Sequence, residues 1–209
     1  MNIGIDVDGV LVDLESYQRK AGVDFFENKL GRSIVNPAGY DLCDIYGCSK
    51  EEREKFWIRY IWAYCLTLPA IKGAAEAIKE LHADGNRIVI ITGRAHTAEH
   101  GVTGWLFRYM LRYWLKKNKI VFDEIFFCDE NSSAKEKFRI CREQRIDIMV
   151  DDKPEILTAV CQERTAICYP AVWNRNIAQG KIISVKDWDE IYHYISQYKK
   201  FSSGSYFKH

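Results

Sequence analysis

The 209-residue sequence carries almost no net charge. Lys and Arg total 30 against 29 Asp and Glu, which leaves a formal charge of +1. A chain without a strong overall field is not drawn as a whole to nucleic acid or to anionic lipid, so local groups have to capture any anionic ligand. We therefore expect neither a stable nucleic-acid partner nor a membrane partner.

The sequence also lacks a C-x-x-C pair and any long apolar run. Its seven cysteines are odd in number and lie mostly in apolar segments, which favours reduced core residues of a cytosolic protein. The first residues have neither the basic nor the apolar part of a secretory signal. Apolar runs such as Ile88 to Ile91 fall far short of the ~20 residues that a membrane helix needs. We expect a cytoplasmic protein, and nothing in the sequence indicates its oligomeric state.

Short β-rich runs alternate with helical patterns along the chain. The runs are Ile3 to Val7, Arg87 to Thr92, Glu124 to Cys128, Ile146 to Val150, Thr165 to Tyr169 and Lys181 to Val185. This alternation is typical of an α/β fold, a doubly wound, Rossmann-like parallel sheet with helices on both faces. An apolar helical stripe ends before Gly85, a plausible C-cap, and another follows Asp187, a good N-cap.

One interval breaks this rhythm. Between the first two strands, roughly Asp13 to Lys72, about 60 residues intervene where a simple crossover needs far fewer. Within it Ser49 and Glu52 form a capping box ahead of an amphipathic aromatic pattern. We predict a small, mostly helical cap at 13–72, a core made of 1–12 and 73–200, and a frayed tail at 201–209.

Acidic residues stand at the ends of two predicted strands. The first strand ends in Asp6-Val7-Asp8-Gly9, at the edge where open α/β sheets place their ligands. Gly9 allows a sharp turn, so that both carboxylates can converge beyond the strand end. A calcium-binding loop is the alternative, but the loop lacks a Glu at its twelfth position. A later strand ends in Asp151 and Asp152, and such a concentration of carboxylates suggests an oxygen-ligated Mg²⁺.

Other polar residues accompany these acids. Thr92 ends a buried strand and can donate a hydrogen bond to a phosphoryl oxygen, while Gly93 opens the backbone beside it. Lys137 lies in the helix that leads to Asp151 and can offset the negative charge, with Lys135 as its rival. Asp152 can also serve as the cap of the helix that Pro154 opens.

These signals, in this order, resemble the motifs of the haloacid dehalogenase superfamily. Those motifs are D-x-D-G-V/T near the amino terminus, an apolar strand ending in Thr or Ser, a Lys, and an apolar strand ending in paired acids. The resemblance covers the whole chain, and the insertion stands where that superfamily places its C1 cap. The segment Trp188-Asp189-Glu190-Ile191 looks like the tail helix of bacterial proteins similar to cytosolic 5′-(pyrimidine) deoxyribonucleotidases.

The resemblance implies a role for each motif residue. Asp6 would be the nucleophile, and Asp8 would protonate the leaving alkoxide and then activate water. Mg²⁺ would be held by Asp6, the backbone carbonyl of Asp8 and Asp151, with Asp152 acting through water or outside the direct ligands. The substrate phosphate would be bound by Thr92, Gly93, Arg94 and Lys137. The acid at position 8 implies hydrolysis of a phosphate ester.

The expected substrate is a small phosphorylated metabolite, with a nucleoside 5′-monophosphate leading. A sugar-phosphate phosphatase, a phosphomutase and a binding protein that has kept the fold without turnover are the alternatives. Arg94 and His96 follow Thr92 and can reach a substrate. Four aromatic residues of the predicted cap are candidates for stacking on a nucleobase or for core packing: Phe25, Tyr40, Tyr46 and Trp57.

Overall fold

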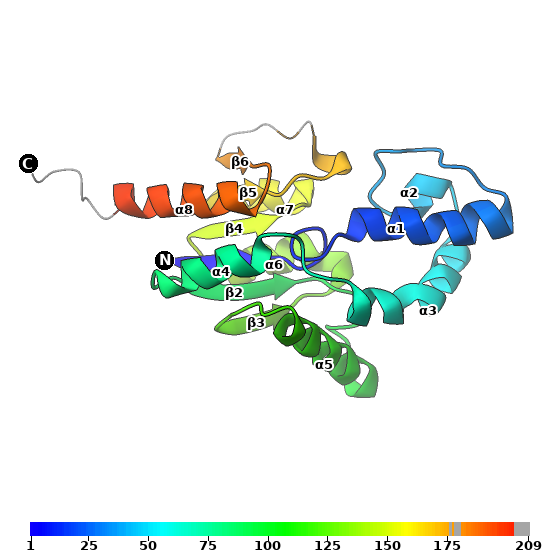
Figure 1. Cartoon of the computed structure of the whole chain (residues 1–209), viewed down its shortest axis with the longest axis horizontal. Helices are drawn as coiled ribbons and strands as arrows, with labels where there is room; N and C mark the ends of the chain where they lie inside the picture. The colour runs from blue at the N-terminus through cyan, green and yellow to red at the C-terminus, as the bar shows by residue number, and fades with distance from the viewer. Residues whose placement is uncertain (176, 178–180, 203–209) are drawn as a thin grey trace, which may run out of the picture.

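The computed structural model describes residues 1–175, 177 and 181–202. Within this part, six parallel strands form one sheet in the order β3-β2-β1-β4-β5-β6 (Figure 1). The strands are β1 (Asn2–Ile5), β2 (Arg87–Thr92), β3 (Glu124–Phe127), β4 (Ile148–Asp151), β5 (Thr165–Cys168) and β6 (Ile182–Ser184). All the predicted strands are present, with small shifts at their ends. The expected α/β fold is confirmed.

Helices cover both faces of this sheet. On one face lie α4 (Ala74–Ala83), α5 (Gly101–Lys117) and α8 (Trp188–Ser202), and on the other α6 (Ser133–Glu143) and α7 (Pro154–Val160). Alternate strand residues serve the two layers: Ile88 and Ile90 join the first, whereas Val89 and Ile91 join the second. Because both faces are buried in the middle of the sheet, β2 is apolar from Ile88 to Ile91 without alternation.

The ends of two helices follow the signals in the sequence. Asp187 caps α8, because its Oδ1 accepts the backbone N–H of Glu190 at 3.0 Å. Gly85 follows α4 with a φ of +79°. The backbone of 201 and 202 belongs to α8, and the remainder of the expected tail, 203–209, lies outside the described residues.

The segment between β1 and α4 is mostly helical, as expected. It contains α1 (Leu14–Gly22), a π-helical turn η1 (Val23–Lys29), α2 (Leu42–Tyr46) and α3 (Lys50–Thr67). These helices lie beside the sheet, on the side toward which the arrow of β2 points (Figure 1). The predicted capping box opens α3, with Ser49 and Glu52 bonded reciprocally.

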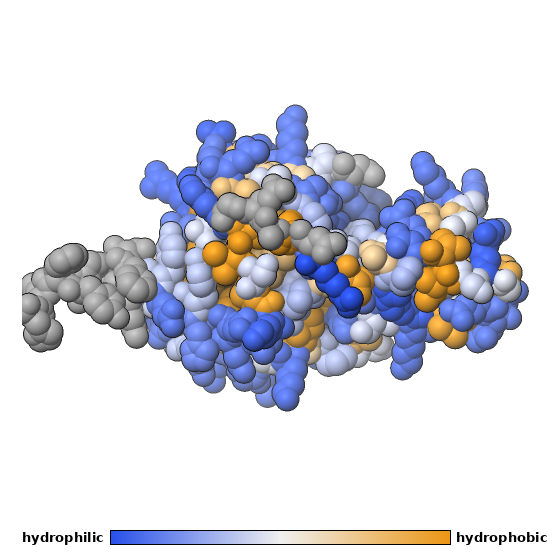
Figure 2. Space-filling model, turned by 90° about the horizontal axis from the view of Figure 1, so that it is seen from above, coloured by the Kyte–Doolittle hydropathy of each residue, from blue (hydrophilic) through white to orange (hydrophobic). Residues whose placement is uncertain are grey.

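The inserted helices have a small core of their own. The Phe26 ring stacks on Tyr46 at 4.5 Å and on Phe56 at 5.7 Å between ring centroids. Seen from above, apolar areas lie over the sheet domain and over the inserted helices, among mostly hydrophilic side chains (Figure 2). This separate cluster gives the segment a fixed shape next to the sheet.

Two further features concern the cysteines and the helices. All seven cysteines are free, although the sulfurs of Cys43 and Cys48 lie 3.6 Å apart. Among the described residues, no helix combines the length and the apolar character needed to cross a membrane.

Candidate active site

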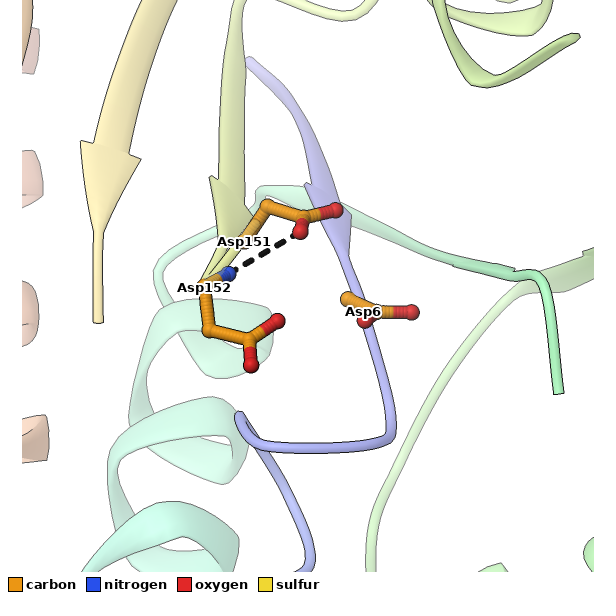
Figure 3. Close-up of side chains that lie close together, drawn as sticks. All are labelled: Asp6, Asp151 and Asp152. Atoms are coloured by element: carbon orange, nitrogen blue, oxygen red, sulfur yellow. Dashed lines mark hydrogen bonds between the residues drawn. The ribbon is translucent and has the colours of Figure 1, made fainter. Parts of the chain in front are cut away.

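Three buried carboxylates lie close together between β1 and β4, where the strand order of the sheet reverses. The chain adds β2 and β3 on one side of β1 and then β4 on the other, so β1 and β4 are neighbours although they are far apart in sequence. Asp6 follows β1, Asp151 ends β4 and Asp152 follows it; each offers an oxygen within 4.8 Å of the others (Figure 3). Ligand sites of open α/β sheets form at such switch points.

The turn after Asp6 depends on a glycine. Gly9 has a φ of +82°, and a Cβ atom at this position would lie 2.1 Å from Oδ2 of Asp152. The carbonyl oxygen of Val7 accepts backbone N–H groups from Leu11 and Val12, at 2.8 and 3.0 Å, which closes the turn. A residue with a side chain would therefore be strained and would displace Asp152.

One buried lysine joins two of the carboxylates. Nζ of Lys137 lies 2.8 Å from Oδ1 of Asp6 and 2.7 Å from Oδ2 of Asp151. Lys137 is 1% exposed, whereas Lys135 is exposed on the outer side of α6. The structure brings Lys137, and not its rival, into the cluster.

The paired acids of β4 have different surroundings. Oδ1 of Asp151 accepts the backbone N–H groups of Asp152 and Lys153, at 2.9 and 3.0 Å, and Oδ2 binds Lys137. Both carboxylate oxygens of Asp152 are buried without a hydrogen-bond partner. Asp152 does not cap α7, whose N-cap residue is Lys153. A buried carboxylate without donors is costly unless a proton or a cation joins it.

Burial and crowding raise the pKa values of these acids. Burial raises the pKa of Asp6 to about 6, although the ammonium of Lys137 opposes the shift. The pKa of Asp152 lies well above its usual range because the group is buried and because Asp151 and Asp6 add negative charge. Burial lowers the pKa of Lys137, but Asp151 and Asp6 more than offset this, so the lysine stays charged. One ammonium does not neutralise three carboxylates, and a divalent cation fits this donor set.

Two residues from different parts of the chain, Tyr64 and Arg94, contact the carboxylate of Asp8. Tyr64, near the end of α3, donates its hydroxyl to Oδ1 of Asp8 at 2.6 Å. Nη1 of Arg94 lies 3.6 Å from the same oxygen, and its guanidinium is 4.7 Å from the centroid of the Tyr64 ring. Burial, followed by the charge of Asp8, raises the pKa of Tyr64 well above its usual range, so the hydroxyl keeps its proton.

Comparison with known families places this cluster in context. Residues 1–201 match the family described as 5′ nucleotidase, deoxy (pyrimidine), cytosolic type C protein. The chain belongs to this 5′-nucleotidase family. It is accordingly a phosphoric monoester hydrolase, and the resemblance to the haloacid dehalogenase superfamily is confirmed.

Individual proteins are similar to this chain in sequence or in fold. The chain is 25% identical to a Chlorobaculum tepidum protein named "Putative 5′(3′)-deoxyribonucleotidase", over 94% of this chain and 90% of that one. Its fold is similar to that of a haloacid dehalogenase-like family hydrolase from Xanthomonas campestris, with a TM-score of 0.60, 16% identity and coverage of 94% and 95%. It is also similar to the D,D-heptose 1,7-bisphosphate phosphatase of B. bronchiseptica, solved with magnesium and phosphate, with a TM-score of 0.54, 16% identity and coverage of 94% and 98%.

The end of β2 contributes a further polar position to the site. Thr92 is fully buried, and its Oγ1 accepts the backbone N–H of Arg94 at 3.2 Å. A Cβ atom on Gly93 would lie 3.1 Å from the Cβ of Ser133, so the chain passes close to α6 here. The side chain of Arg94 is buried, and its Nε and Nη1 have no hydrogen-bond partner. His96, in contrast, is exposed and pairs with Glu99.

One of the aromatic candidates lies beside the acidic cluster. Burial and the charges of Asp152 and Asp8 raise the pKa of Tyr40 well above its usual range. Its ring packs edge-on against Trp173 at 4.9 Å, and the ammonium of Lys153 lies 4.4 Å from the ring centroid. The other three candidates pack with aromatic neighbours inside the inserted segment: Phe25, Tyr46 and Trp57.

Sequence reasoning did not identify several residues of this site. Trp173 and Asn174 donate to the backbone carbonyl oxygen of Asp152, at 3.2 and 2.7 Å, and support it from η3 (Val172–Asn174). Tyr64 belongs to the amphipathic aromatic pattern that follows the Ser49–Glu52 capping box, and that pattern indicates no partner for its hydroxyl. A phenol in such a pattern needs a partner when buried, and this was the available signal.

Proposed function

We propose that this member of the 5′-nucleotidase family hydrolyses nucleoside 5′-monophosphates through an aspartyl-phosphate intermediate and with Mg²⁺. The observation that carries the proposal is the buried contact of Asp6 with Lys137, at 2.8 Å, beside the two acids that end β4. The positive charge of Lys137 stabilises the ionised form of Asp6, the nucleophile, in its buried position. The same charge attracts the incoming phosphoryl group.

The chemistry assigned to Asp6 has two steps. A carboxylate oxygen of Asp6 attacks phosphorus, and the bond from phosphorus to the leaving oxygen breaks. Water then attacks the phosphoryl-Asp6 and releases inorganic phosphate. Asp8 gives a proton to the leaving alkoxide in the first step and takes one from water in the second. Thr92, Gly93, Arg94 and Lys137 bind the phosphoryl oxygens.

The acidic cluster suits Mg²⁺. The groups that would hold it are Asp6, the backbone carbonyl of Asp8 and either Asp151 or Asp152. The sequence-based interpretation makes Asp151 the direct ligand and places Asp152 outside it. The hydrogen bonds favour the reverse, because both oxygens of Asp151 already have donors and those of Asp152 have none. When bound, Mg²⁺ would offset the charge of these carboxylates and of the phosphate.

The substrate is assigned from two sources. The family description names deoxy (pyrimidine) nucleotides, and the Chlorobaculum relative is named for deoxyribonucleotides. Tyr40 offers an aromatic ring beside the carboxylates, which supports a ligand with a planar group.

We assign residues 13–72 to a cap that selects the substrate, and 1–12 with 73–200 to the catalytic core. The seven free cysteines favour the cytoplasm.

Phosphate release tests the proposal directly. The panel contains pyrimidine and purine nucleoside monophosphates, ribose and deoxyribose forms, sugar phosphates and an aryl phosphate, each with Mg²⁺ and with EDTA. We expect nucleotides to be the best substrates, EDTA to abolish turnover and Mg²⁺ to restore it. Asp6→Asn provides the background rate. A preference for sugar phosphates would overturn the substrate assignment, and full turnover in metal-free buffer would overturn the metal assignment.

A further inference from the structure

The two oxygens of Asp8 are not equivalent. Oδ1 accepts the Tyr64 hydroxyl at 2.6 Å and has Nη1 of Arg94 at 3.6 Å. Among the described residues, Oδ2 takes part in no hydrogen bond or ion pair. The Asp8 side chain is 17% exposed, so this oxygen is not sealed inside the core. Hydrogen-bond and charged donors therefore surround Oδ1 of the carboxylate, whereas Oδ2 has none in the described part of the chain.

The contact from Tyr64 crosses between two parts of the fold. Tyr64 lies near the end of α3 in the inserted segment and is 2% exposed, whereas Asp8 lies in the turn after β1. Its ring is fixed by Trp57 and Tyr17, with centroids at 5.6 and 5.1 Å, and by the Arg94 guanidinium on its face. A ring held on several sides directs its hydroxyl to one position.

A neighbouring tyrosine shows what a purely structural hydroxyl does here. Tyr17 contacts the Tyr64 ring but donates its own hydroxyl to the backbone carbonyl of Tyr60 at 2.8 Å. Tyr64 instead donates to the carboxylate to which the proposed function assigns the proton transfers. The two phenols share one aromatic cluster and differ in what they bind, which makes them a matched pair.

We infer that Tyr64 is a positioning residue that, with Arg94, reserves Oδ1 of Asp8 as an acceptor and leaves Oδ2 to carry the transferred proton. The inference rests on the proposed function. In the first step the Oδ2–H bond breaks as the proton moves to the leaving oxygen, which takes the electron pair of its bond to phosphorus. In the second, Oδ2 receives a proton from water as water oxygen bonds to phosphorus and the bond from phosphorus to Asp6 breaks.

The decisive variant is Tyr64→Phe, which removes the hydroxyl and keeps the ring contacts. It is compared with Tyr17→Phe on thymidine 5′-monophosphate and on 4-nitrophenyl phosphate. For Tyr64→Phe we expect kcat on the nucleotide to fall by on the order of 10- to 100-fold, as for a misplaced catalytic group, with little change in KM. The rate of nitrophenol release in the first turnover should change far less, because nitrophenolate leaves without a proton from Asp8. Tyr17→Phe should match wild type.

A double-mutant cycle separates positioning from a general effect on the fold. If Tyr64 acts through Asp8, adding Tyr64→Phe to Asp8→Asn should change the remaining kcat on thymidine 5′-monophosphate by less than about 2-fold. Equal losses on both leaving groups, a change confined to KM, or a full effect of Tyr64→Phe in the Asp8→Asn background would each overturn the inference. Wild type that hydrolyses neither substrate would instead refute the proposed function.

Discussion

A Cβ atom on Gly9 would lie 2.1 Å from Oδ2 of Asp152, a residue whose two carboxylate oxygens both lack a hydrogen-bond partner. Gly9 also has a φ of +82°, so Gly9→Ala adds backbone strain to a collision within the acidic cluster. We expect Gly9→Ala to lower Mg²⁺ affinity by ~10-fold or more, as for a displaced supporting group, measured by calorimetric titration.

Gly85→Ala is the control for this variant. Gly85 has a φ of +79°, but a Cβ atom there would meet nothing within 4 Å. The left-handed conformation costs both variants ~1 to 2 kcal/mol of folding stability, whereas only Gly9→Ala disturbs Asp152. Unchanged Mg²⁺ affinity in Gly9→Ala would mean that Asp152 does not help to hold the ion.

The unequal surroundings of Asp151 and Asp152 predict opposite effects of two similar substitutions. Asp152→Asn removes a buried acid without donors, so the metal-free protein should keep or gain stability while Mg²⁺ no longer raises its melting temperature. Asp151→Asn removes the charge that pairs with Lys137 at 2.7 Å. Loss of this carboxylate partner of the buried lysine should lower the free energy of unfolding by ~3 to 5 kcal/mol. Thermal melts with EDTA and with Mg²⁺ test both expectations, and a reversed order would restore Asp151 as the direct ligand.

The raised pKa of Asp6 predicts how the stability of the metal-free protein depends on pH. Its pKa is 3.8 when unperturbed and about 6 in the fold, so between these values the folded state binds more protons than the unfolded state. Stability from this group is therefore lost as pH rises from about 4 to 6, by ~3 kcal/mol in total. Denaturant unfolding with EDTA should show a difference between wild type and Asp6→Asn that changes over this range. A difference independent of pH would contradict the shift.

The position of Tyr40 predicts a specificity effect. Tyr40→Ala removes the ring beside Trp173 and the acidic cluster, so KM for a nucleotide should rise by ~10-fold if the ring stacks on the base. Hydrolysis of a small aryl phosphate should change little. Tyr109→Ala, at a residue 57% exposed on α5, is the control for loss of an aromatic ring elsewhere. Equal loss on both substrates in a folded variant would assign Tyr40 to packing.

Much of this fold could be predicted because its signals are local. Apolar runs marked the six described strands, and the acids at strand ends meet because β1 and β4 are neighbours. The choice of Lys137 was also open to reasoning. It shares the buried face of α6 with Ile140 and Cys141, at spacings of three and four residues, whereas Lys135 lies off that face.

The details that decide individual roles are not local. Tyr64 reaches Asp8 across 56 positions of sequence, and no periodic pattern specifies a partner at that separation. Asp151 and Asp152 differ because the ammonium of Lys137 lies against only one of them. That same acid, Asp151, also accepts the hydrogen bonds of the backbone N–H groups that follow β4. Both acids follow the same apolar run, so the sequence does not distinguish them.

The division of labour between Asp6 and Asp8 gives the sharpest test of the proposed chemistry. Asp6→Asn removes the nucleophile, so turnover should vanish for every substrate. Asp8→Asn keeps the nucleophile and loses a general acid and base whose contribution is typically ~10² to 10⁴-fold. A nucleoside alkoxide needs its proton, so nucleotide hydrolysis should fall by about that factor.

An aryl phosphate should behave differently in Asp8→Asn, because its leaving group departs without a proton. Asp6 should be phosphorylated and then persist as the phosphoenzyme, since water is no longer activated. The expected result is a burst of nitrophenol comparable to the enzyme concentration, with the added phosphoryl group visible in the intact mass. If Asp6→Asn accumulated the phosphoenzyme instead, the nucleophile would have to be another residue. Lys137, which lies 2.8 Å from Asp6, would then bind the phosphate without activating an attacking carboxylate.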